Sequence, residues 1–432
     1  MELRISILLL LIFFKTSFAQ DPMSKADILY YEYAYADAIQ EYQKEILDAP
    51  LSNQQFLNLA ESYFKTADYQ RAADTYFEVY KKDSDISSNH FNTMLRAITR
   101  TSGLDMVRTL LASRSSSFPK ELMENADLNY QLISPGDTTA LKFTTFNIDS
   151  NSPQADFSPS FYQDKLLFTS GRTDESKNIY GPSGESYLNI YVARMSEDGN
   201  ILNPNPFTSL PGTRYHQATP YYSENLDQFF YILSNSDDDE LIFDENGKNS
   251  LAIGAVDKNG NFRYLMRDMG TSFYYPFYDI STDRLYFAAN LEDSYGGTDL
   301  YYVTTNNGLI MSSPINLGPR INSPGNEISP YIFDGSLYFA SDVFYGLGGM
   351  DLYKSELQND DLFSIPINLG SGMNTSKDDF GLIIKPGKEK GYIGYFASNR
   401  DGGRGQDDIY GFKVAEMPGP RTLLLKGSVV NP

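Results

Sequence analysis

A degenerate unit of about 55 residues recurs five times between Asp156 and Val414, and this period constrains the fold more than any other feature of the sequence. Each copy contains several short apolar segments that are separated by turn residues. A regular repeat of this kind is typical of folds in which one unit stacks on the next, because a single unit cannot bury its own apolar faces. The period therefore predicts a repeat architecture.

The copies share a Ser-Pro-aromatic start, an apolar run that ends in small polar residues, and a close formed by an acid, an aliphatic residue and Tyr. In the fifth copy Leu382 replaces the start proline, and the second copy diverges at its close. We interpret the repeat residues as structural. They are Pro159, Pro220, Pro276, Pro330, Asp299, Tyr301, Asp351, Tyr353, Asp408 and Tyr410.

Each repeat is long enough for four short strands. The run from Leu337 to Ala340 is apolar on both faces, which suits a strand that lies between neighbouring sheets. A β-sandwich or a barrel also uses many short strands, but four strands per unit of this length favour a radial arrangement. The sequence therefore predicts an all-β propeller with five blades, with six blades as the alternative.

The fifth repeat holds three strands of its own, so the ring needs a fourth strand from elsewhere. The segment from Leu141 to Ile148 precedes the first copy where Ile315 to Leu317 precedes the fourth. We expect this segment to pair with the strand that contains Tyr410, which would join the two ends of the ring and remove an exposed edge.

The N-terminus has the pattern of a cleavable secretory signal over residues 1–19. Arg4 is followed by the apolar stretch from Ile5 to Phe14 and by the small-x-small site Ser17 to Ala19. We expect export, with Gln20 as the first residue of the mature chain. A membrane anchor is the alternative, but this apolar stretch is too short to span a bilayer, and no transmembrane segment is predicted later in the chain.

The chain contains 0 cysteines, which excludes disulfides, thiolate metal sites and a lipidated cysteine. Together with the signal pattern, this favours a location in a bacterial periplasm. The net charge of −21 argues against nucleic acid as a partner. The acidic run from Asp237 to Glu240 lacks the spacing and the glycine of a calcium loop, so a solvated turn is expected there.

Residues 20–115 have helical spacing and a second period. Ala26, Tyr35, Ala38 and Tyr42 recur 34 positions later as Ala60, Tyr69, Ala72 and Tyr76, and a third copy is worn. This interval and pattern resemble the tetratricopeptide repeat, a pair of antiparallel helices. Two to three repeats are rarely stable by themselves, and we therefore expect them to pack on the propeller or on a partner. Their concave face is expected to hold an extended peptide or a helix, with a spacer that binds nothing as the alternative.

Turn-forming residues delimit the remaining segments. Residues 116–140, which include Pro119 and Pro135, are predicted to be a connector, and the propeller is predicted to span residues 141–415. Residues 416–432 are predicted to be a linker and the first strand of a further domain, from Leu423 to Val430.

The common catalytic motifs are missing. The sequence has no Gly-x-Ser-x-Gly, no phosphate-binding Gly-rich loop with Lys-Ser/Thr and no His-Glu-x-x-His, and His90 and His216 are expected to be ordinary polar residues. We therefore predict that the chain is not an enzyme and uses no metal or other cofactor. Candidate ligand-binding residues at the propeller turns are Arg172, Arg400, Asp401 and Arg404, and the alternative is that the arginines form structural ion pairs with carboxylates.

The Ser-Pro-aromatic, Leu-Tyr-Phe-Ala-Ser and Gly-Gly-x-Asp-Leu-Tyr segments resemble the WD-like propeller repeats of the TolB type over about 260 residues. Tetratricopeptide-like hairpins come before them, and the segment from Lys426 to Val430 is similar to the start of a carboxypeptidase-regulatory-like domain. This order resembles the multidomain OmpA-family envelope proteins of Bacteroidota, including PorE-like components of type IX secretion.

The resemblance implies a non-catalytic periplasmic scaffold that is associated with the outer membrane and docks onto its secretion or gliding machinery. Its partners would be envelope proteins, bound through the tetratricopeptide-like groove and a propeller face. Peptidoglycan would be bound only through a C-terminal OmpA-like domain, which this sequence does not contain. Two alternatives remain: a propeller enzyme that acts on wall glycans or peptides, and a TolB-like partner protein.

Overall fold

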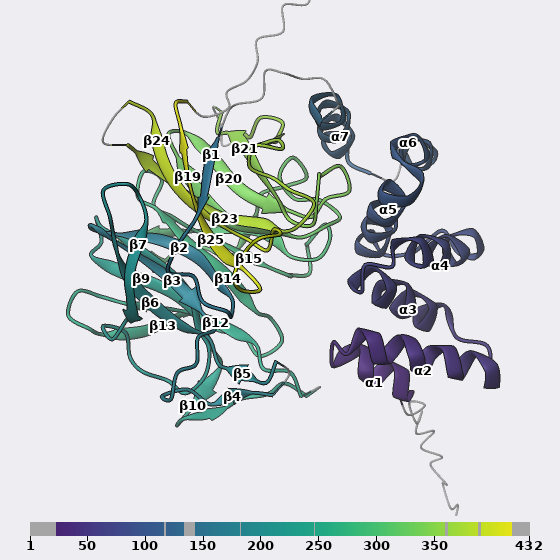
Figure 1. Ribbon diagram of the computed structural model, residues 1–432, viewed down its shortest axis with the longest axis horizontal. Coiled ribbons are helices and arrows are strands. Elements are labelled where there is room, and N and C mark those ends of the chain that lie inside the picture. Colours follow the sequence, from purple (N-terminus) through teal and green to yellow (C-terminus); the bar gives the residue numbers. More distant parts are fainter. Residues whose placement is uncertain are drawn as a thin grey trace, which may run out of the picture.

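The computed structural model describes residues 23–115, 118–133, 143–181, 183–245, 247–358, 362–387 and 390–416. Within these residues a helical region comes first and a five-bladed β-propeller follows, as the repeats predict (Figure 1). The predicted signal segment, Gln20 and the predicted strand from Leu423 to Val430 lie outside the described residues. No helix of the described part is long and apolar enough to cross a membrane.

The helices form antiparallel hairpins. Their bounds are α1 Lys25–Tyr31, α2 Tyr35–Asp48, α3 Asn53–Lys65, α4 Tyr69–Lys82, α5 Ser88–Ser102, α6 Leu104–Ser113 and α7 Lys120–Ile133. Side chains cap several N-termini: Ser52, for example, forms a capping box with Gln55. The repeated alanines Ala26 and Ala60 are fully buried, which lets neighbouring helices approach closely.

Helix α7 lies inside the segment that was predicted to be a connector, so that prediction missed an element. The serines and Pro119 before the helix indicated a linker, and two of its inward-facing residues are the polar Asn125 and Asn129. Both asparagines are buried because they bind the propeller backbone, a contact that helical periodicity of apolar residues does not reveal.

Each blade is an antiparallel sheet whose strands run from the channel outward. Blade 1 contains β2 Asp156–Tyr162, β3 Lys165–Ser170, β6 Asn189–Met195 and β7 Ile201–Pro206; blade 2 contains β8 Gln217–Ser223, β9 Gln228–Ser234, β12 Leu251–Val256 and β13 Phe262–Met266. Blade 3 contains β14 Phe273–Asp279, β15 Arg284–Ala289, β16 Asp299–Asn306 and β18 Ile315–Asn316, with β17 Leu309–Ile310 paired to the end of β16. Blade 4 contains β19 Glu327–Phe333, β20 Ser336–Ser341, β21 Asp351–Glu356 and β22 Ile367–Asn368.

Blade 5 confirms the predicted closure. It contains β23 Asp379–Pro386, β24 Tyr392–Ser398 and β25 Asp408–Val414, and its outer strand is β1 Thr144–Asn147. Strand β1 pairs antiparallel with β25, with Thr144 opposite Lys413 and Asn147 opposite Tyr410. The segment before the first repeat therefore closes the ring.

A backbone hydrogen bond joins blade 5 to blade 1, and an equivalent hydrogen bond joins blade 3 to blade 4. The Asp156 N–H donates to the Asp407 carbonyl at 2.7 Å, and the Glu327 N–H donates to the Thr298 carbonyl at 2.6 Å between blades 3 and 4. The junction where the chain ends meet thus repeats an ordinary blade junction.

Two short hairpins extend from the first two blades: β4 Ile179–Tyr180 with β5 Glu185–Ser186, and β10 Ser236–Asp237 with β11 Glu240–Leu241. The second hairpin contains the acidic run. Its turn residues Asp238 and Asp239 have positive φ and are exposed, which confirms the predicted solvated turn.

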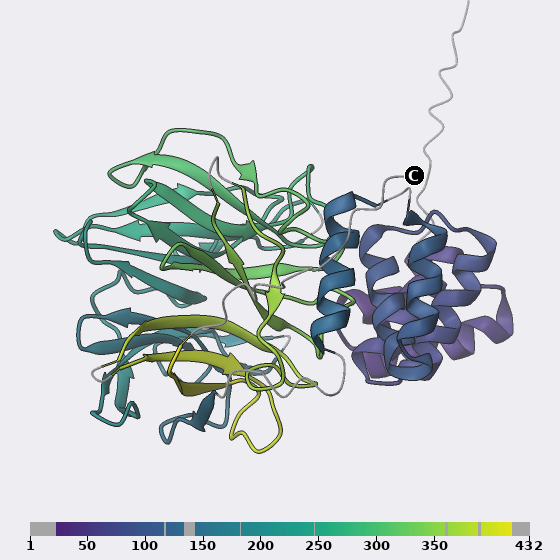
Figure 2. The same cartoon turned by 90° about the horizontal axis from the view of Figure 1, so that it is seen from above.

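The helical region packs on one face of the propeller (Figure 2). One buried apolar cluster combines residues of the helices with residues of blades 3 and 4, so the two regions share a core. The expectation that the helices pack on the propeller is confirmed.

Candidate functional site

The Ser-Pro-aromatic starts line the central channel. In each first strand the residue before the start position has positive φ, and the pairing register shifts there. These five residues are Ser158 (φ 50°), Thr219 (46°), Tyr275 (51°), Ser329 (56°) and Gly381 (68°). The bulges surround a cavity of about 50 Å³, far smaller than the few hundred Å³ of a typical ligand pocket.

The structure places Arg172 and Arg400 at equivalent positions after the second strands of blades 1 and 5. Arg172 Nη2 lies 3.1 Å from Asp156 Oδ2, and Arg400 Nη2 lies 2.6 Å from Asp379 Oδ1. Each guanidinium also donates to a backbone carbonyl, of Ser150 and of Met373. Both arginines are therefore bound to buried acids of their own blades.

The other two candidates lie apart from these ion pairs. The Asp401 side chain is 93% exposed, and Lys377 Nζ is 3.5 Å from it. Arg404 donates its backbone N–H to Asp408 and its side-chain Nη1 to the Asp149 carbonyl. The four candidate residues therefore do not converge on one ligand site, and a ligand-binding role for them stays a prediction.

The closing aspartates hold the turn before the third strand. Asp299, Asp351 and Asp408 are buried, and each accepts hydrogen bonds from the backbone N–H of a residue four positions earlier. Burial raises the pKa of Asp299 to about 6 and the pKa of Asp351 to about 7. Their position is consistent with the structural interpretation made from the sequence.

Sequence reasoning missed a set of asparagines that act with these aspartates. Asn316 donates to Asp299, and the amide of Asn322 bonds with both backbone groups of Leu300. Asn368 and Asn374 repeat the arrangement in blade 4, and Asn147 and Asn151 repeat it in blade 5. The recurring Ile-Asn-Leu-Gly segments at residues 315–318 and 367–370 were the available signal.

Both histidines are partly buried. His216 Nδ1 accepts the Leu188 N–H at 3.0 Å, and burial lowers the pKa of His216 to about 4. His90 lies 6.0 Å from the ring of Tyr76, and burial lowers the pKa of His90 as well. No cluster of three potential metal ligands occurs within the residues that the structure describes.

Two carboxylates, Asp378 and Asp407, lie close enough to the channel residue Tyr275 for their charges to act on it, and we call them the acidic mouth. Burial, and next the charge of Asp378, raise the pKa of Asp407 to about 6. Asp378 accepts the Met350 N–H and the Asn399 side-chain amide, each at 2.8 Å. Burial, followed by the charges of these two acids among others, also raises the pKa of Tyr275, which lines the channel.

Arg100 of α5 lies close enough to Asp378 for the two charges to interact. Burial lowers the pKa of Arg100, and Asp378 is among the charges that act on it in the opposite direction. The guanidinium also lies over the ring of Tyr69, 4.4 Å from its centroid. The helical region thus places a cation near one of the two carboxylates, Asp378.

Polar contacts between the helices and the propeller come from α5 and α7 in the described part of the chain. Arg96 of α5 forms an ion pair with Asp342 at 2.7 Å, with both side chains largely buried. Asn129 of α7 donates to the Pro366 carbonyl and accepts the Asn368 N–H. These bonds fix the helices on blades 3 and 4.

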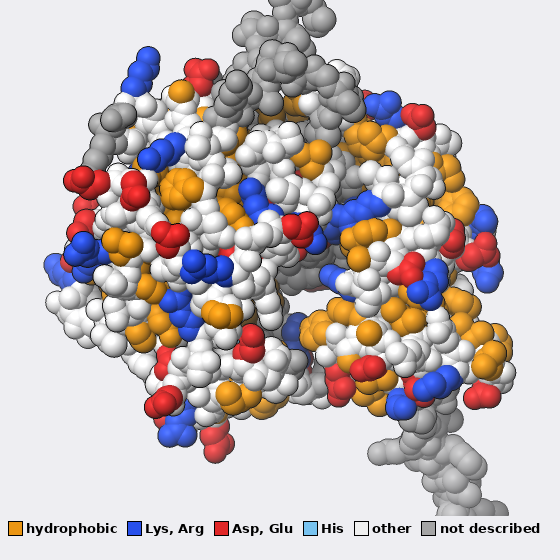
Figure 3. Space-filling model, viewed as in Figure 1, with side chains coloured by type: hydrophobic (Ala, Val, Ile, Leu, Met, Phe, Trp, Pro, Cys, Tyr) orange, Lys and Arg blue, Asp and Glu red, His pale blue; other side chains and the backbone are white. Residues whose placement is uncertain are grey.

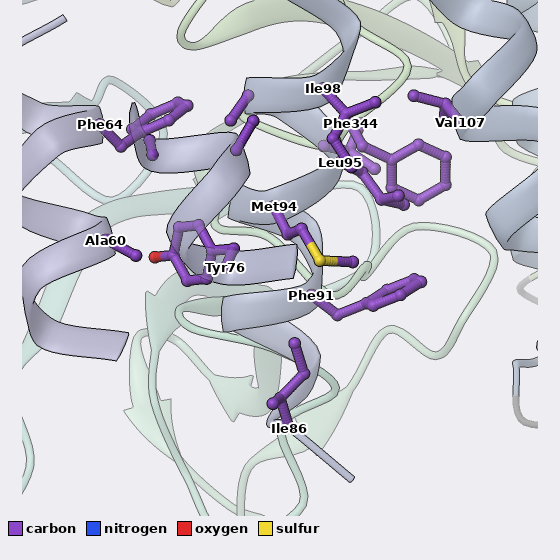
Figure 4. Packing of buried hydrophobic residues seen from close by; sticks show 14 of the residues in the cluster. Ala60, Phe64, Tyr76, Ile86, Phe91, Met94, Leu95, Ile98, Val107 and Phe344 are labelled. Carbon is purple, nitrogen blue, oxygen red and sulfur yellow. The ribbon is translucent and has the colours of Figure 1, made fainter. Parts of the chain in front are cut away.

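An apolar contact reinforces them. Phe344, in the loop between β20 and β21, belongs to the shared core, and Figure 4 shows its ring beside Leu95, Ile98 and Val107 of α5 and α6. The propeller therefore inserts one of its own aromatic side chains into the helical array.

The α1 end of the helical array is not filled in this way. Figure 3 shows an opening between the propeller and the helices at this end. Tyr31 and Tyr33 are 56% and 68% exposed here. Tyr33 is close enough to Tyr180 of β4 to contribute, after burial, to a raised pKa of Tyr180.

Comparisons with known proteins bear on the fold. No protein-family model matches this chain, and no curated protein sequence matches it. Similar solved structures include an endo-arabinase from Bacteroides thetaiotaomicron, with 10% identity, 65% of this chain and 99% of the other covered, and a TM-score of 0.43. A family 117 glycoside hydrolase from Zobellia galactanivorans has 14% identity, covers 63% of this chain and 90% of its own length, and has a TM-score of 0.39. A putative TolB from Agrobacterium tumefaciens has 14% identity, coverages of 60% and 78%, and a TM-score of 0.35.

These findings correct one prediction. We predicted from missing motifs that the chain is not an enzyme. Several of the similar propellers are glycoside hydrolases, so the fold and the missing motifs do not exclude an enzyme, and that prediction is wrong. At these identities the likeness concerns the fold and assigns no reaction to this chain.

Proposed function

We propose that this chain is an exported binding protein of the bacterial envelope, in which the helices and the propeller together hold a polypeptide segment of a partner protein. The observation that carries the proposal is the insertion of Phe344 into the helical array. The helices already bind an irregular loop with an aromatic side chain at their α5–α6 end. The same array has room for a second such segment at its α1 end.

The side chains at the α1 end suit this role. Tyr30, Tyr31, Tyr33 and Tyr35 form edge-to-face contacts with one another, with ring centroids 5.1 to 6.2 Å apart. Tyrosines combine an apolar ring with a polar end and lose little conformational entropy on binding, so they are enriched in protein interfaces. Tyr180 and Tyr187 of blade 1 form a second aromatic pair, with ring centroids 5.2 Å apart, and Tyr180 lies close enough to Tyr33 for the pKa of Tyr180 to be raised by it after burial.

Export and location belong to the same proposal. The signal pattern of residues 1–19 and the absence of cysteine support a periplasmic location at the outer membrane. The order of modules, through its resemblance to OmpA-family envelope proteins, supports secretion or gliding machinery as the source of the partner.

In vivo photo-crosslinking tests the binding proposal. A photoreactive phenylalanine analogue is placed at Tyr31 or Tyr33 in the full chain, and captured polypeptides are identified by mass spectrometry. Met311, which is 66% exposed on the propeller, serves as the control position. We expect one envelope polypeptide to be captured from positions 31 and 33 and not from 311. The same set of proteins at all three positions would contradict the proposal.

A glycan-processing reaction is the second candidate, and the acidic mouth favours it. Catalytic carboxylate pairs in glycosidases have environments that separate their pKa values, so that one acts as an acid and the other as a base or nucleophile. In such a reaction Asp407, with its raised pKa, would be the general acid and Asp378 its partner.

Hydrolysis assays test this second candidate. The purified chain is incubated with soluble envelope glycans, and new reducing ends are counted for the wild type, Asp407→Asn and Asp378→Asn, with the exposed Asp401→Asn as control. A general acid contributes about 10²- to 10⁴-fold, so either mouth variant should lose at least about a hundredfold. Activity should fall as the pH rises through about 6. No release of reducing ends by the wild type would reject the candidate.

A further inference from the structure

A second cavity lies between blades 1 and 2, away from the channel. Its volume is about 370 Å³, which is within the range of small-molecule sites. Its walls come from the loop after β3, the start of β6, the connection between β7 and β8, and the turn between β10 and β11. We call it the blade 1–2 pocket.

Its lining combines an apolar wall with polar groups. Phe207 and Leu210 are apolar, and Ser176, Asn189 and Gln217 carry hydroxyl and amide groups. An apolar surface that carries a small number of polar groups is typical of sites that orient a small ligand. A sugar ring, with its apolar C–H faces and polar hydroxyls, matches this mixture.

The wall of the pocket also contains a buried cation. Lys177 is only 8% exposed, and its ammonium donates to the carbonyls of Thr213 and Tyr215 and to Gln217 Oε1, at 2.8 to 3.1 Å. All three acceptors are neutral, and none of the ion pairs found among the described residues involves Lys177. Burial lowers the pKa of Lys177 to about 8, and Asp174 partly opposes that shift.

A buried charge of this kind is costly unless an opposite charge compensates it. The three acceptors use all the donors of the ammonium, so Lys177 does not bind a ligand directly. It contributes positive potential to the pocket and ties the loop after β3 to the connection before β8. An anion in the pocket would compensate its charge.

Arg214 supplies the group that can bind such an anion. It lies at the rim and is exposed, and its backbone carbonyl accepts the Asn178 N–H. A guanidinium offers five donors in a planar fork that fits a carboxylate. Asp239, on the opposite hairpin, also reaches the lining and supplies an acceptor for hydroxyl groups.

We propose that the blade 1–2 pocket binds a small sugar acid, with the carboxylate on Arg214, the ring against Phe207 and Leu210, and the hydroxyls on the polar side chains of the wall. This site is separate from the opening at the α1 end and from the acidic mouth. It can therefore hold or fail independently of the functions proposed above.

Calorimetric titration of the full chain with galacturonate tests the proposal, with galactose and acetate as matched probes. We expect galacturonate to bind. Galactose and acetate should each bind at least about tenfold more weakly, because galactose lacks the carboxylate and acetate lacks the sugar ring. The affinity for galacturonate should fall between about pH 7 and 9, because Lys177 loses its charge near pH 8.

Two variants locate the binding. Arg214→Gln should weaken galacturonate about tenfold to a hundredfold, as expected for a charged hydrogen-bonding pair. Gly212→Phe should abolish binding, because Gly212 lines the pocket and nothing lies within 4 Å of an added Cβ. Arg194→Gln, which removes another exposed arginine of blade 1, should leave binding unchanged.

Three results would overturn the proposal. They are absence of galacturonate binding at about 10 mM, equal binding of galactose, and galacturonate binding that survives both Arg214→Gln and Gly212→Phe. Far-ultraviolet circular dichroism of each variant shows whether the fold is retained, and Arg214→Gln, being at an exposed rim position, is expected to retain it.

Discussion

Glu327, the first residue of β19, shows how this propeller stabilises buried acids. Its side chain is fully buried, and its carboxylate accepts hydrogen bonds from the Ser323 N–H, the Ser323 hydroxyl and the Ser341 hydroxyl. Asp156 and Asp379 occupy the same place in blades 1 and 5, where Arg172 and Arg400 supply positive charge. Blade 4 has Val343 in place of the arginine, so Glu327 has no such partner.

The first prediction follows from this difference. Burial, and next the charge of Asp299, raise the pKa of Glu327 from 4.5 to about 8. Between these pH values the folded state retains a proton that the unfolded state releases, so the free energy of unfolding falls as pH rises, by at most about 1.4 kcal/mol per pH unit. In Glu327→Gln this contribution is absent.

Urea unfolding at several pH values checks the prediction. We expect the wild type to lose stability relative to Glu327→Gln between about pH 5 and 8, and the two to differ little in slope below pH 4. The exposed Asp401→Asn serves as control. Parallel pH profiles of the wild type and Glu327→Gln across this range would show that the environment of Glu327 does not disfavour its charge.

At the scale of elements, the loop between β20 and β21 connects the propeller to the helices. It carries Asp342, which pairs with Arg96, and Phe344, which packs against α5 and α6. The helices therefore receive an aromatic side chain from the same polypeptide chain, and this contact fixes their orientation on the propeller. A groove that binds a partner stays a prediction.

The second prediction concerns Phe344→Ala. Removing a buried phenylalanine from a core costs about 3 to 5 kcal/mol, and here the loss falls on the shared core of the helices and blade 4. We expect hydrogen exchange to become faster in α5, α6 and the loop that contains Phe344, while β8 to β13 of blade 2 remain protected. Leu309→Ala, at a position that is 53% exposed, should change stability by no more than about 0.5 kcal/mol. Uniformly faster exchange across all blades would contradict a local role for Phe344.

At the scale of the whole molecule, the sequence was sufficient to predict those features that repeat at a regular interval along the chain. The repeat of about 55 residues predicted five blades, and the three strands of the last copy predicted that β1 completes it. Contacts without a period could not be predicted. Helix α7 binds the propeller through Asn125 and Asn129, and the partner groups are about 200 positions later in the chain.

The candidate site was predicted less well than the fold, for a related reason. Arg172 and Arg400 were singled out because they follow second strands, but their partners, Asp156 and Asp379, lie at the starts of first strands and become neighbours only in the folded blade. Asp407 and Lys177 were not singled out, because their pKa values are changed by burial, which the local sequence does not reveal.

The last prediction concerns the closure of the ring. Gly411 of β25 lies under Phe146 of β1, and an added Cβ at Gly411 would lie 2.3 Å from Phe146 Cζ. Gly411→Ala should therefore displace β1 and lower the free energy of unfolding by about 1 to 3 kcal/mol, as overpacking typically does. In a Phe146→Ala background the same substitution should cost much less, because the obstructing ring is gone. Gly181→Ala, with nothing within 4 Å of the added Cβ, is the matched control.

A double-mutant cycle from urea unfolding measures the coupling between positions 146 and 411. A coupling near zero would mean that β1 does not hold the ring closed through this contact, whereas a coupling above about 1 kcal/mol would show that the strand preceding the first repeat stabilises the last one.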